Sequence, residues 1–203
     1  YLRLEDDLRR FILATPRERE AREVRWAIYD LVAEALSAGR VSLGGGGPDL
    51  DAERRRITTV VVHHSGTLAD IPLARLSAMG LLRLYAPAYL AGPARGTAIR
   101  SHHWRDGRQV FFPYHWLVRP DGRMERLLED GQVGWHAGDW EVNCASVGIC
   151  FAGDYCERAP SAAAISSFRR LAARYAGARI IPHSAVNGRT DCPGAWFRHS
   201  RLD

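Results

Sequence analysis

A histidine and a cysteine near the end of the 203-residue sequence have the types and the spacing to hold a metal ion. His183 and Cys192 lie nine residues apart, and the loop between them closes in Cys-Pro-Gly, which can fix the thiol in a turn. Two donors are too few for a catalytic zinc ion, which takes about three protein ligands and keeps one position open for water. A third donor must therefore come from elsewhere in the chain.

The best source of that third donor is the pair His63 and His64. The pair ends a run of threonine and valine at residues 58–62, and this β-branched run predicts a buried strand. Because successive side chains of a strand point to opposite faces, we expect one imidazole to face the loop of Cys192 and the other to support it or face away. Either histidine alone would be interpreted as a polar residue at the rim of a sheet.

The four cysteines do not form a disulfide framework in a chain of this size. Cys144 and Cys150 flank a predicted buried strand, and we interpret both as small core residues. Cys156 carries no further signal. Cys192 lies among polar residues, so a second interpretation is open, in which its thiol is the nucleophile of a Cys-His hydrolase.

The composition is 46% hydrophobic and 25% charged, which is typical of a globular protein. The net charge of +5 is carried by arginine alone, and it favours proximity to an anionic polymer such as a cell wall. The arginines are scattered and do not alternate with aromatic residues along a helix, which argues against nucleic-acid binding. We find no apolar run of the ~18 residues that a membrane span needs and no signal peptide. The sequence begins with Tyr1, so we expect a fragment or a processed form.

The first 40 or so residues are predicted to form two helices. The second should begin near Pro16, where a capping box occurs, and should bury one apolar stripe, made of Val24, Ile28, Leu31, Val32 and Leu36. A run of four glycines at residues 44–47 indicates a flexible break. We therefore expect a helical appendage with its linker at residues 1–48 and the main domain at residues 49–203.

The main domain alternates between strand and helix patterns. Strands are predicted at residues 57–63, 145–152 and 179–182, a hairpin turns around Pro120-Asp121-Gly122, and helices are predicted from residue 73, at 97–104 and at 162–175. Such intermixing indicates an α/β domain with a central mixed β-sheet flanked by helices. The candidate donors His63 and His183 then lie at strand ends.

Four separate stretches of the sequence resemble one known family. They are Val61-Val62-His63-His64-Ser65, then Tyr114-His115-Trp116-Leu117-Val118 with Asp121-Gly122, then His136 to Trp140 running on to Ser146-Val147-Gly148-Ile149, and finally His183 to Gly194. In this order they resemble the zinc N-acetylmuramoyl-L-alanine amidases, the superfamily of phage amidase lysozymes and peptidoglycan recognition proteins. The resemblance covers residues 57 to 197, and it implies a central mixed sheet flanked by helices with one zinc ion in a cleft.

Carried over by position, the resemblance implies that His63, His183 and Cys192 are the zinc ligands. Donor chemistry alone points to His183 and Cys192, with either His63 or His64 as the third donor. One feature departs from the family pattern, because the usual spacing from histidine to cysteine is eight and here it is nine. We expect Asn187-Gly188 to absorb the extra residue as a bulge.

The resemblance also implies roles for residues around the metal. The active-site tyrosine of the family falls on Tyr114. Two residues before the cysteine, phage enzymes carry lysine and catalytic recognition proteins carry threonine, so Thr190 places this chain with the second group. The cleft histidine of the family falls on His136, with Trp140 close by, and we group both with His64 as candidate substrate contacts.

The activity that the resemblance implies is zinc-dependent hydrolysis of the amide between N-acetylmuramic acid and L-alanine, in peptidoglycan or in soluble muropeptides. No glutamate falls in a family position for a general base. The alternative is a peptidoglycan or muropeptide recognition module that binds without cutting. A cell-wall enzyme of this kind is expected to be exported or released at lysis, and the sequence does not predict an oligomeric state.

Overall fold

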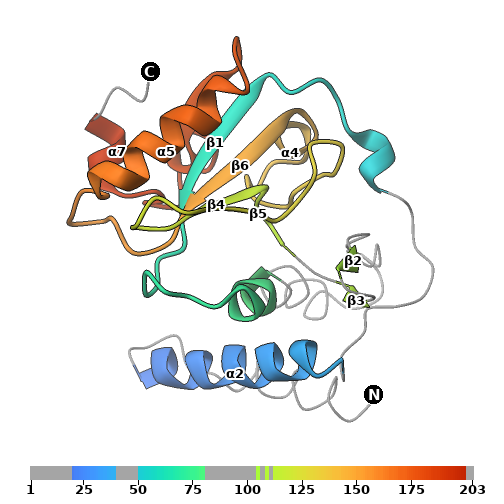
Figure 1. Cartoon of the computed structure of the whole chain (residues 1–203), viewed down its shortest axis with the longest axis vertical. Coiled ribbons are helices and arrows are strands. Elements are labelled where there is room, and N and C mark those ends of the chain that lie inside the picture. The colour runs from blue at the N-terminus through green and yellow to red at the C-terminus, as the bar shows by residue number, and fades with distance from the viewer. Residues whose placement is uncertain (1–19, 40–49, 81–103, 106–107, 110–111, 200–203) are drawn as a thin grey trace. The chain divides into compact units, whose positions relative to one another are not determined.

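The computed structural model describes residues 20–39, 50–80, 104–105, 108–109 and 112–199 (Figure 1). The chain forms two compact units, one of residues 1–49 with 72–111 and one of residues 50–71 with 112–203. The predicted metal donors and cleft residues all belong to the second unit. The domain boundary that we expected after residue 48 stays a prediction.

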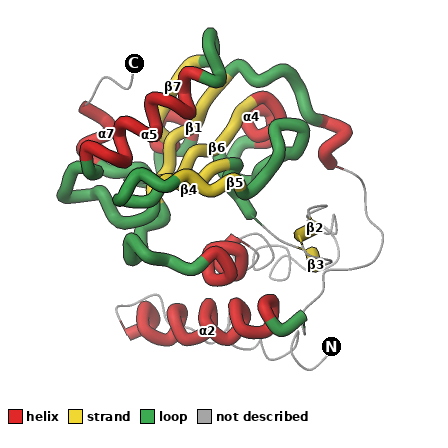
Figure 2. Tube along the Cα trace, viewed as in Figure 1, coloured by secondary structure: helices red, strands yellow, loops and turns green. Residues whose placement is uncertain are grey.

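A five-stranded mixed sheet forms the centre of the second unit (Figure 2). Its order is β5-β4-β6-β1-β7, and only the β4–β5 hairpin is antiparallel. The strands are β1 (Thr59–His64), β4 (Trp116–Val118), β5 (Met124–Arg126), β6 (Ser146–Phe151) and β7 (Arg179–Pro182). The predicted fold class, a central mixed sheet flanked by helices, is confirmed.

One face of this sheet is covered by the helices α5 (Ala162–Ala173) and α7 (Ala195–His199), which Figure 1 shows along the same side of β1 and β6. The rings of Phe168 and Phe197 contact Phe151 of β6, with centroids 5.5 and 4.9 Å away. Burying such side chains contributes about 1.5–3 kcal/mol each. The face that carries Val60, Val62, Ile149 and Phe151 is therefore the hydrophobic core.

The opposite face carries the chemistry. In the parallel register of β1 with β6, Val61 lies beside Gly148 and His63 lies beside Cys150. Because side chains alternate along a strand, His63 points away from the core of α5 and α7. Parallel strands end at the same edge of a sheet, so the end of β1 at His64 and the end of β7 at Pro182 lie together.

The hairpin, the strands β1, β6 and β7 and the helix α5 agree with the sequence predictions, with ends that differ by a few residues. Three short helices were not predicted: α4 (Trp140–Ala145), α6 (His183–Val186) and α7. A helix of four to six residues is too short to show an apolar period. The 3-10 helix η1 (Leu50–Glu53) precedes β1. The first predicted helix lies outside the described residues, as does the helix predicted at residues 97–104 except for Trp104, which begins a short strand instead.

The first unit contains α2 (Glu20–Ser37), a helix at residues 73–80, and the short antiparallel pair β2 (Trp104–Arg105) and β3 (Arg108–Gln109). The predicted second helix is confirmed as α2, and Val32 on it is buried. Leu31 was expected on the buried stripe but is 53% exposed, so that member of the stripe was wrong. Arg75 forms an ion pair with Asp30.

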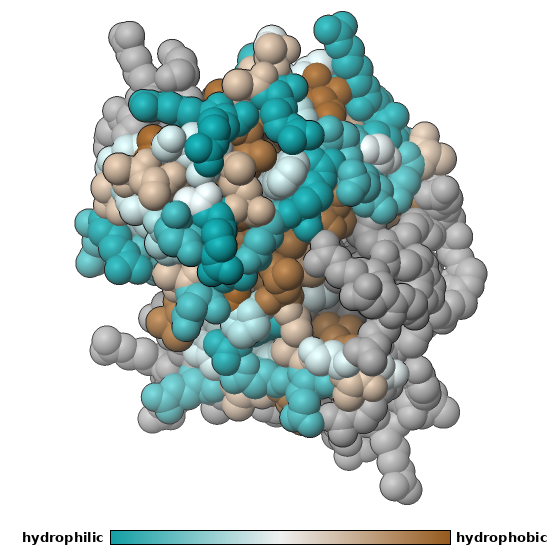
Figure 3. All heavy atoms as spheres, viewed as in Figure 1, coloured by the Kyte–Doolittle hydropathy of each residue, from teal (hydrophilic) through white to brown (hydrophobic). Residues whose placement is uncertain are grey.

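The described surface is largely polar in the view of Figure 3, with hydrophilic side chains spread over the sheet unit and small apolar areas between them. Within the described part of the chain, no helix combines the length and the apolar character that crossing a membrane requires.

An ion pair at the base of the hairpin ties it to the segment that follows β1. Arg119 Nε and Nη2 donate to the two carboxylate oxygens of Glu125 at 3.1 and 2.9 Å, and Arg119 Nη1 donates to the carbonyl of Ile71 at 2.6 Å. Side-chain exposure is only 8% for Arg119 and 24% for Glu125. The pair therefore closes a buried network between two segments that are distant in sequence.

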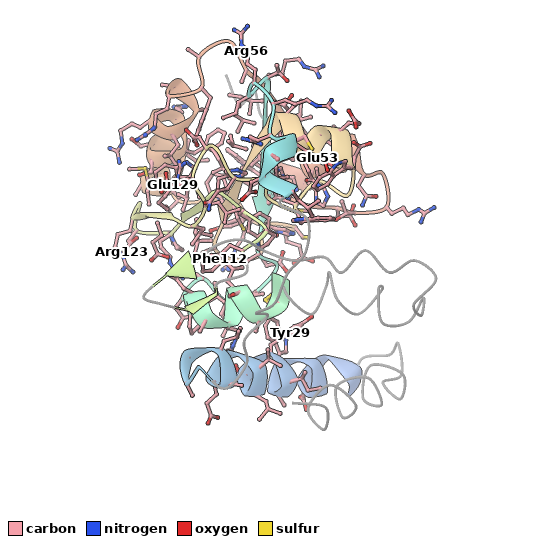
Figure 4. The ribbon with its side chains drawn as sticks, turned by 90° about the vertical axis from the view of Figure 1, so that its right-hand side faces the viewer. Tyr29, Glu53, Arg56, Phe112, Arg123 and Glu129 are labelled. Carbon is pink, nitrogen blue, oxygen red and sulfur yellow. The ribbon has the colours of Figure 1, made fainter. Side chains whose placement is uncertain are left out.

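Replacing Arg119 by methionine should destabilise the protein by about 3 kcal/mol, because the Glu125 carboxylate stays partly buried without its partner. Denaturant unfolding measures this change. The matched control is Arg123→Met: Arg123 pairs with Asp121 at 2.7 Å, but it points outward from the hairpin turn (Figure 4) and 71% of its side chain is exposed. We expect little change in the control. Equal losses in the two variants would contradict the role of the buried network.

Candidate metal centre

Three donor side chains from separate segments converge on one point. His63 comes from the end of β1, His183 is the first residue of α6, and Cys192 comes from the loop before α7. Their donor atoms all lie within 4.8 Å of one another. His63 Nδ1 lies 3.7 Å from Cys192 Sγ. A tetrahedral zinc ion with ordinary bond lengths would hold such a nitrogen and sulfur about 3.6 Å apart, so the donor set fits zinc.

The second ring nitrogen of each histidine has a partner of its own. His183 Nε2 lies 3.2 Å from the carbonyl of Ala137, to which only a protonated nitrogen can donate. His63 Nε2 lies 3.0 Å from His136 Nδ1. The Ala137 carbonyl fixes the ring proton of His183 on Nε2, and with the proton of His63 also on Nε2 both rings would present Nδ1 to a metal. Such hydrogen bonds orient metal-binding imidazoles and raise their basicity.

His136 is buried beneath the donor group. Its Nδ1 faces His63, and its Nε2 lies 3.3 Å from Ser146 Oγ. Burial, and next the electrostatic influence of His115, His183 and Arg54, hold the pKa of His136 well below its usual range. A neutral ring can accept from His63 while it donates to Ser146. We expected His136 to contact substrate. In the structure both of its ring nitrogens instead contact side chains of the protein, His63 and Ser146.

The loop of Cys192 is held by backbone hydrogen bonds. The Cys192 amide donates to Thr190 Oγ1 at 3.1 Å, and the Cys192 carbonyl accepts from the Ser184 amide of α6 at 2.8 Å. The second bond connects the cysteine loop to the helix that begins with His183. Cys192 Sγ also lies 3.4 Å from the His64 amide, which can donate to it. An N–H aimed at sulfur favours a thiolate, the form that binds metals.

The loop between His183 and Cys192 contains a turn at Asn187. The Asn187 amide donates to the His183 carbonyl, and Asn187 Oδ1 accepts from the Arg189 amide at 3.1 Å. Gly188 does not have a positive φ. The Asn187 side chain thus forms a turn of a kind that asparagine favours, and the expectation that Asn187-Gly188 absorbs the extra residue stays a prediction.

Tyr114 lies beside the metal donors. It is buried, and its ring centroid lies 4.9 Å from that of His63. The neighbouring His115 is fixed at both nitrogens, because its Nδ1 accepts from the Gly148 amide at 3.1 Å and its Nε2 donates to the Gln132 carbonyl at 2.9 Å. His115 thus anchors the segment that places Tyr114 against His63.

The side chains of two other predicted substrate contacts bond to groups outside the donor set. His64 lies beside Phe151 in the register, so strand alternation turns it toward the other face, where its Nδ1 accepts from the Tyr155 amide at 3.1 Å. Trp140 Nε1 donates to the carboxylate of Glu53 at 2.6 Å, and Figure 4 shows Glu53 on η1. The Trp140 ring also lies 4.6 Å from that of Trp135.

A second group of metal-type donors, His64, Asp154 and Cys156, has donor atoms within 4.8 Å of one another. His64 Nδ1 in this group already accepts the Tyr155 amide. Because Nδ1 accepts that hydrogen bond, the ring proton of His64 lies on Nε2, and neither nitrogen is prepared to bind a metal. The first group is therefore the better-prepared metal centre.

Sequence reasoning missed the residues behind the donors. Asn143 and Ser146 are buried and contact the segment of His136, and the Arg54 guanidinium donates to the carbonyls of both at 3.1 and 2.6 Å. Each is a polar residue in or beside an apolar run. No spacing in the sequence separates such a residue from one that faces solvent.

The sequence profile of the N-acetylmuramoyl-L-alanine amidases matches residues 53–195, a stretch that includes all three donors. The chain therefore belongs to the N-acetylmuramoyl-L-alanine amidase family. Its fold is that of the amidases and peptidoglycan recognition proteins. This membership supports a role in cutting or recognising peptidoglycan. None of the curated protein sequences compared with the chain matches it.

Several solved structures share the fold. The amidase LysC from Clostridium intestinale URNW superposes with a TM-score of 0.51 and 21% identity, over 77% of this chain and 88% of its own. Drosophila peptidoglycan recognition protein SD gives a TM-score of 0.54 and 18% identity, over 76% and 82%. Peptidoglycan recognition protein LE, solved with tracheal cytotoxin, gives 0.50 and 25%, over 70% and 76%.

Replacing Gly148 by alanine should disturb the ring of His136, which contacts His63. A Cβ atom at this position would lie 2.9 Å from the buried His136 ring, so the strand or the ring must move. We expect a loss of about 1–3 kcal/mol in the free energy of unfolding, measured with denaturant. Gly131→Ala is the control, because nothing lies within 4 Å of its Cβ position, and it should stay within about 0.5 kcal/mol of the parent. Unchanged stability of Gly148→Ala would contradict this packing.

Proposed function

We propose that this protein is a zinc-dependent N-acetylmuramoyl-L-alanine amidase that hydrolyses the amide between the lactyl group of N-acetylmuramic acid and L-alanine. The observation that carries the proposal is the convergence of His63, His183 and Cys192, with donor atoms within 4.8 Å of one another. The contacts at Nε2 of both histidines, which orient the two rings, also support it. Membership of the amidase family supports the choice of bond.

An amide is a poor electrophile, and a zinc ion held by these donors would polarise its carbonyl and lower the pKa of a coordinated water to ~7. A thiolate ligand softens the Lewis acid, and it also holds the ion firmly. The protein's own task is then to place the scissile amide and to stabilise the negative charge that develops on its oxygen.

Tyr114 is the proposed donor to that charge. Its ring lies against His63, so a substrate carbonyl near the metal would come within reach of the tyrosine hydroxyl. One such donor, well placed, stabilises a transition state by about 3 kcal/mol. Thr190 is proposed beside it. Its oxygen accepts the Cys192 amide, which leaves the hydroxyl hydrogen free to turn toward substrate.

The substrate is proposed to be peptidoglycan or a muropeptide derived from it. The net charge of +5 favours an anionic wall polymer. The paired rings of Trp135 and Trp140 flank His136 and Ala137 in the sequence, and they offer an aromatic surface for sugar or peptide contact. Among the three predicted substrate contacts, Trp140 keeps that role in the proposal. His136 acts by holding His63, and His64 supports the strand end.

Mass spectrometry of products from defined muropeptides tests the proposal directly. The protein should release free stem peptide that begins with L-alanine, and a chelator should abolish the release until zinc is restored. Cys192→Ser should lose both zinc and activity while it remains folded, because a hydroxyl is a weaker ligand than a thiolate.

Each alternative has its own outcome in this experiment. Stoichiometric zinc without released peptide would identify a recognition module. Activity that survives complete chelation would identify a thiol hydrolase that uses Cys192 as nucleophile. Cleavage of any other bond would reject the proposed substrate. Full metal content in Cys192→Ser would remove the cysteine from the donor set.

Replacing Tyr114 by phenylalanine separates binding of the metal from catalysis. The variant keeps the ring against His63 and loses only the hydroxyl, so zinc content should be unchanged. Turnover of the muropeptide should fall about 100-fold, the usual effect of one lost oxyanion donor. Steady-state kinetics with zinc quantified in the same samples measures both effects. An unchanged rate would remove Tyr114 from the mechanism.

A further inference from the structure

A single buried amide side chain holds the segment behind the donor group. Asn143 lies on α4 and is 4% exposed. Its Oδ1 accepts two backbone hydrogen bonds, from the His136 amide at 3.1 Å and from the Ala137 amide at 2.9 Å. One oxygen thus fixes two consecutive peptide groups.

Those two residues are the ones that orient the metal-binding imidazoles. His136 contacts His63 through its ring, with 3.0 Å between His136 Nδ1 and His63 Nε2. Ala137 contacts His183 through its backbone, because its carbonyl accepts from His183 Nε2 at 3.2 Å. The histidines come from β1 and α6, yet both orienting groups come from one dipeptide. A shift of this dipeptide would therefore turn both rings at once.

The helix that carries Asn143 is itself anchored at both ends. The Asp139 side chain accepts the Val142 amide at 3.0 Å and caps its start. At its end, Arg54 Nη1 donates to the carbonyls of Asn143 at 3.1 Å and Ser146 at 2.6 Å. Ser146 in turn contacts His136 Nε2 through its hydroxyl. Asn143 therefore has a fixed position from which to hold the dipeptide.

We propose that Asn143 is a positioning residue for the metal centre, in which its side-chain oxygen aligns His63 and His183 through the peptide groups of His136 and Ala137. This inference rests on the metal centre of the proposed function. It goes further by assigning the orientation of both imidazoles to one side chain that touches neither of them. It predicts that metal affinity depends on the acceptor oxygen at residue 143.

The test compares two substitutions of Asn143 in the full chain. Asn143→Asp keeps an oxygen at the same position, whereas Asn143→Ala removes it. The matched control is Ser167→Ala, which also loses a buried hydrogen bond, 2.7 Å to the Gly122 carbonyl, but lies on α5 at the opposite face of the sheet. Zinc affinity is measured by competition with a chromophoric chelator. The absorption spectrum of the cobalt(II)-loaded protein reports the number and geometry of its donors.

Zinc binding by Asn143→Ala should weaken about 10-fold. Loss of a group that hydrogen-bonds to a metal ligand usually weakens metal binding by about 10- to 100-fold, and Asn143 acts one step further from the ligands. The cobalt(II) spectrum of Asn143→Ala should show an altered donor geometry. Asn143→Asp and Ser167→Ala should bind zinc like the parent. If Asn143→Ala does not fold without metal, Asn143→Leu provides the second variant. Leucine keeps a branched side chain at this position but has no acceptor oxygen, so zinc binding should weaken as expected for Asn143→Ala.

Parental zinc affinity and cobalt(II) spectrum in folded Asn143→Ala would overturn the inference, as would an equal loss in Ser167→Ala. If the second variant is used, unchanged zinc binding by folded Asn143→Leu would overturn it too. Because metal binding is measured apart from hydrolysis, the two proposals fail separately. If the parent protein binds zinc but cuts no muropeptide, only the amidase proposal is rejected. If the parent cuts muropeptides and Asn143→Ala binds zinc as tightly as the parent, only the inference on Asn143 is rejected.

Discussion

The parallel pairing of β1 with both β6 and β7 is the constraint on which the rest of the structure depends. It makes β1 an interior strand whose ladder is complete on both sides. It also brings the end of β1, at His64, to the same edge as the end of β7, at Pro182. His63 and His183 are 120 residues apart in the sequence, yet their ring centroids lie 4.5 Å apart. Without this register the side chains of His63 and His183 would not meet at one metal centre.

The two faces of the sheet perform different tasks. The face toward α5 and α7 is filled by aliphatic and aromatic side chains, and it supplies the hydrophobic free energy that keeps the strands in place. The other face carries buried polar side chains, among them His63, His136 and Asn143, which hydrogen-bond to one another or to the backbone. Gly148 leaves room there for the His136 ring to lie against β6. Stability and chemistry thus come from opposite sides of the same strands.

The metal donors depend on an ordered set of hydrogen bonds behind them. A histidine ligand without a partner on its second nitrogen can rotate, and rotation moves its lone pair away from the metal. Here His136 and Ala137 supply both partners, and Asn143, Ser146 and Arg54 hold that segment. This preparation distinguishes the His63 group from the group at His64, Asp154 and Cys156. It also explains why a neutral, deeply buried histidine is useful in this position.

Much of this organisation could be predicted from the sequence. The β-branched run before His63, the hairpin around Asp121-Gly122 and the alanine-rich helix after Ser161 are local patterns, because each depends on neighbours a few residues away. The donor types are local information as well. Thiol and imidazole groups at strand ends and in a Cys-Pro-Gly loop indicate a metal centre, and four motifs in order indicate the family.

The remaining features depend on contacts between segments that are distant in the sequence. Leu31 belongs to an apolar stripe and is nevertheless exposed. His136 matched a cleft residue by position, and its environment of Gly148, Ser146 and His63 made it a buried support. Asn143 gave no signal at all. The sequence alone determined which residues could bind a metal and which segments would be strands, because periodicity and side-chain chemistry are properties of the chain itself. Only the tertiary structure decided which imidazole faces the cysteine and what holds it there, because burial and hydrogen-bond partners exist only after distant segments have met.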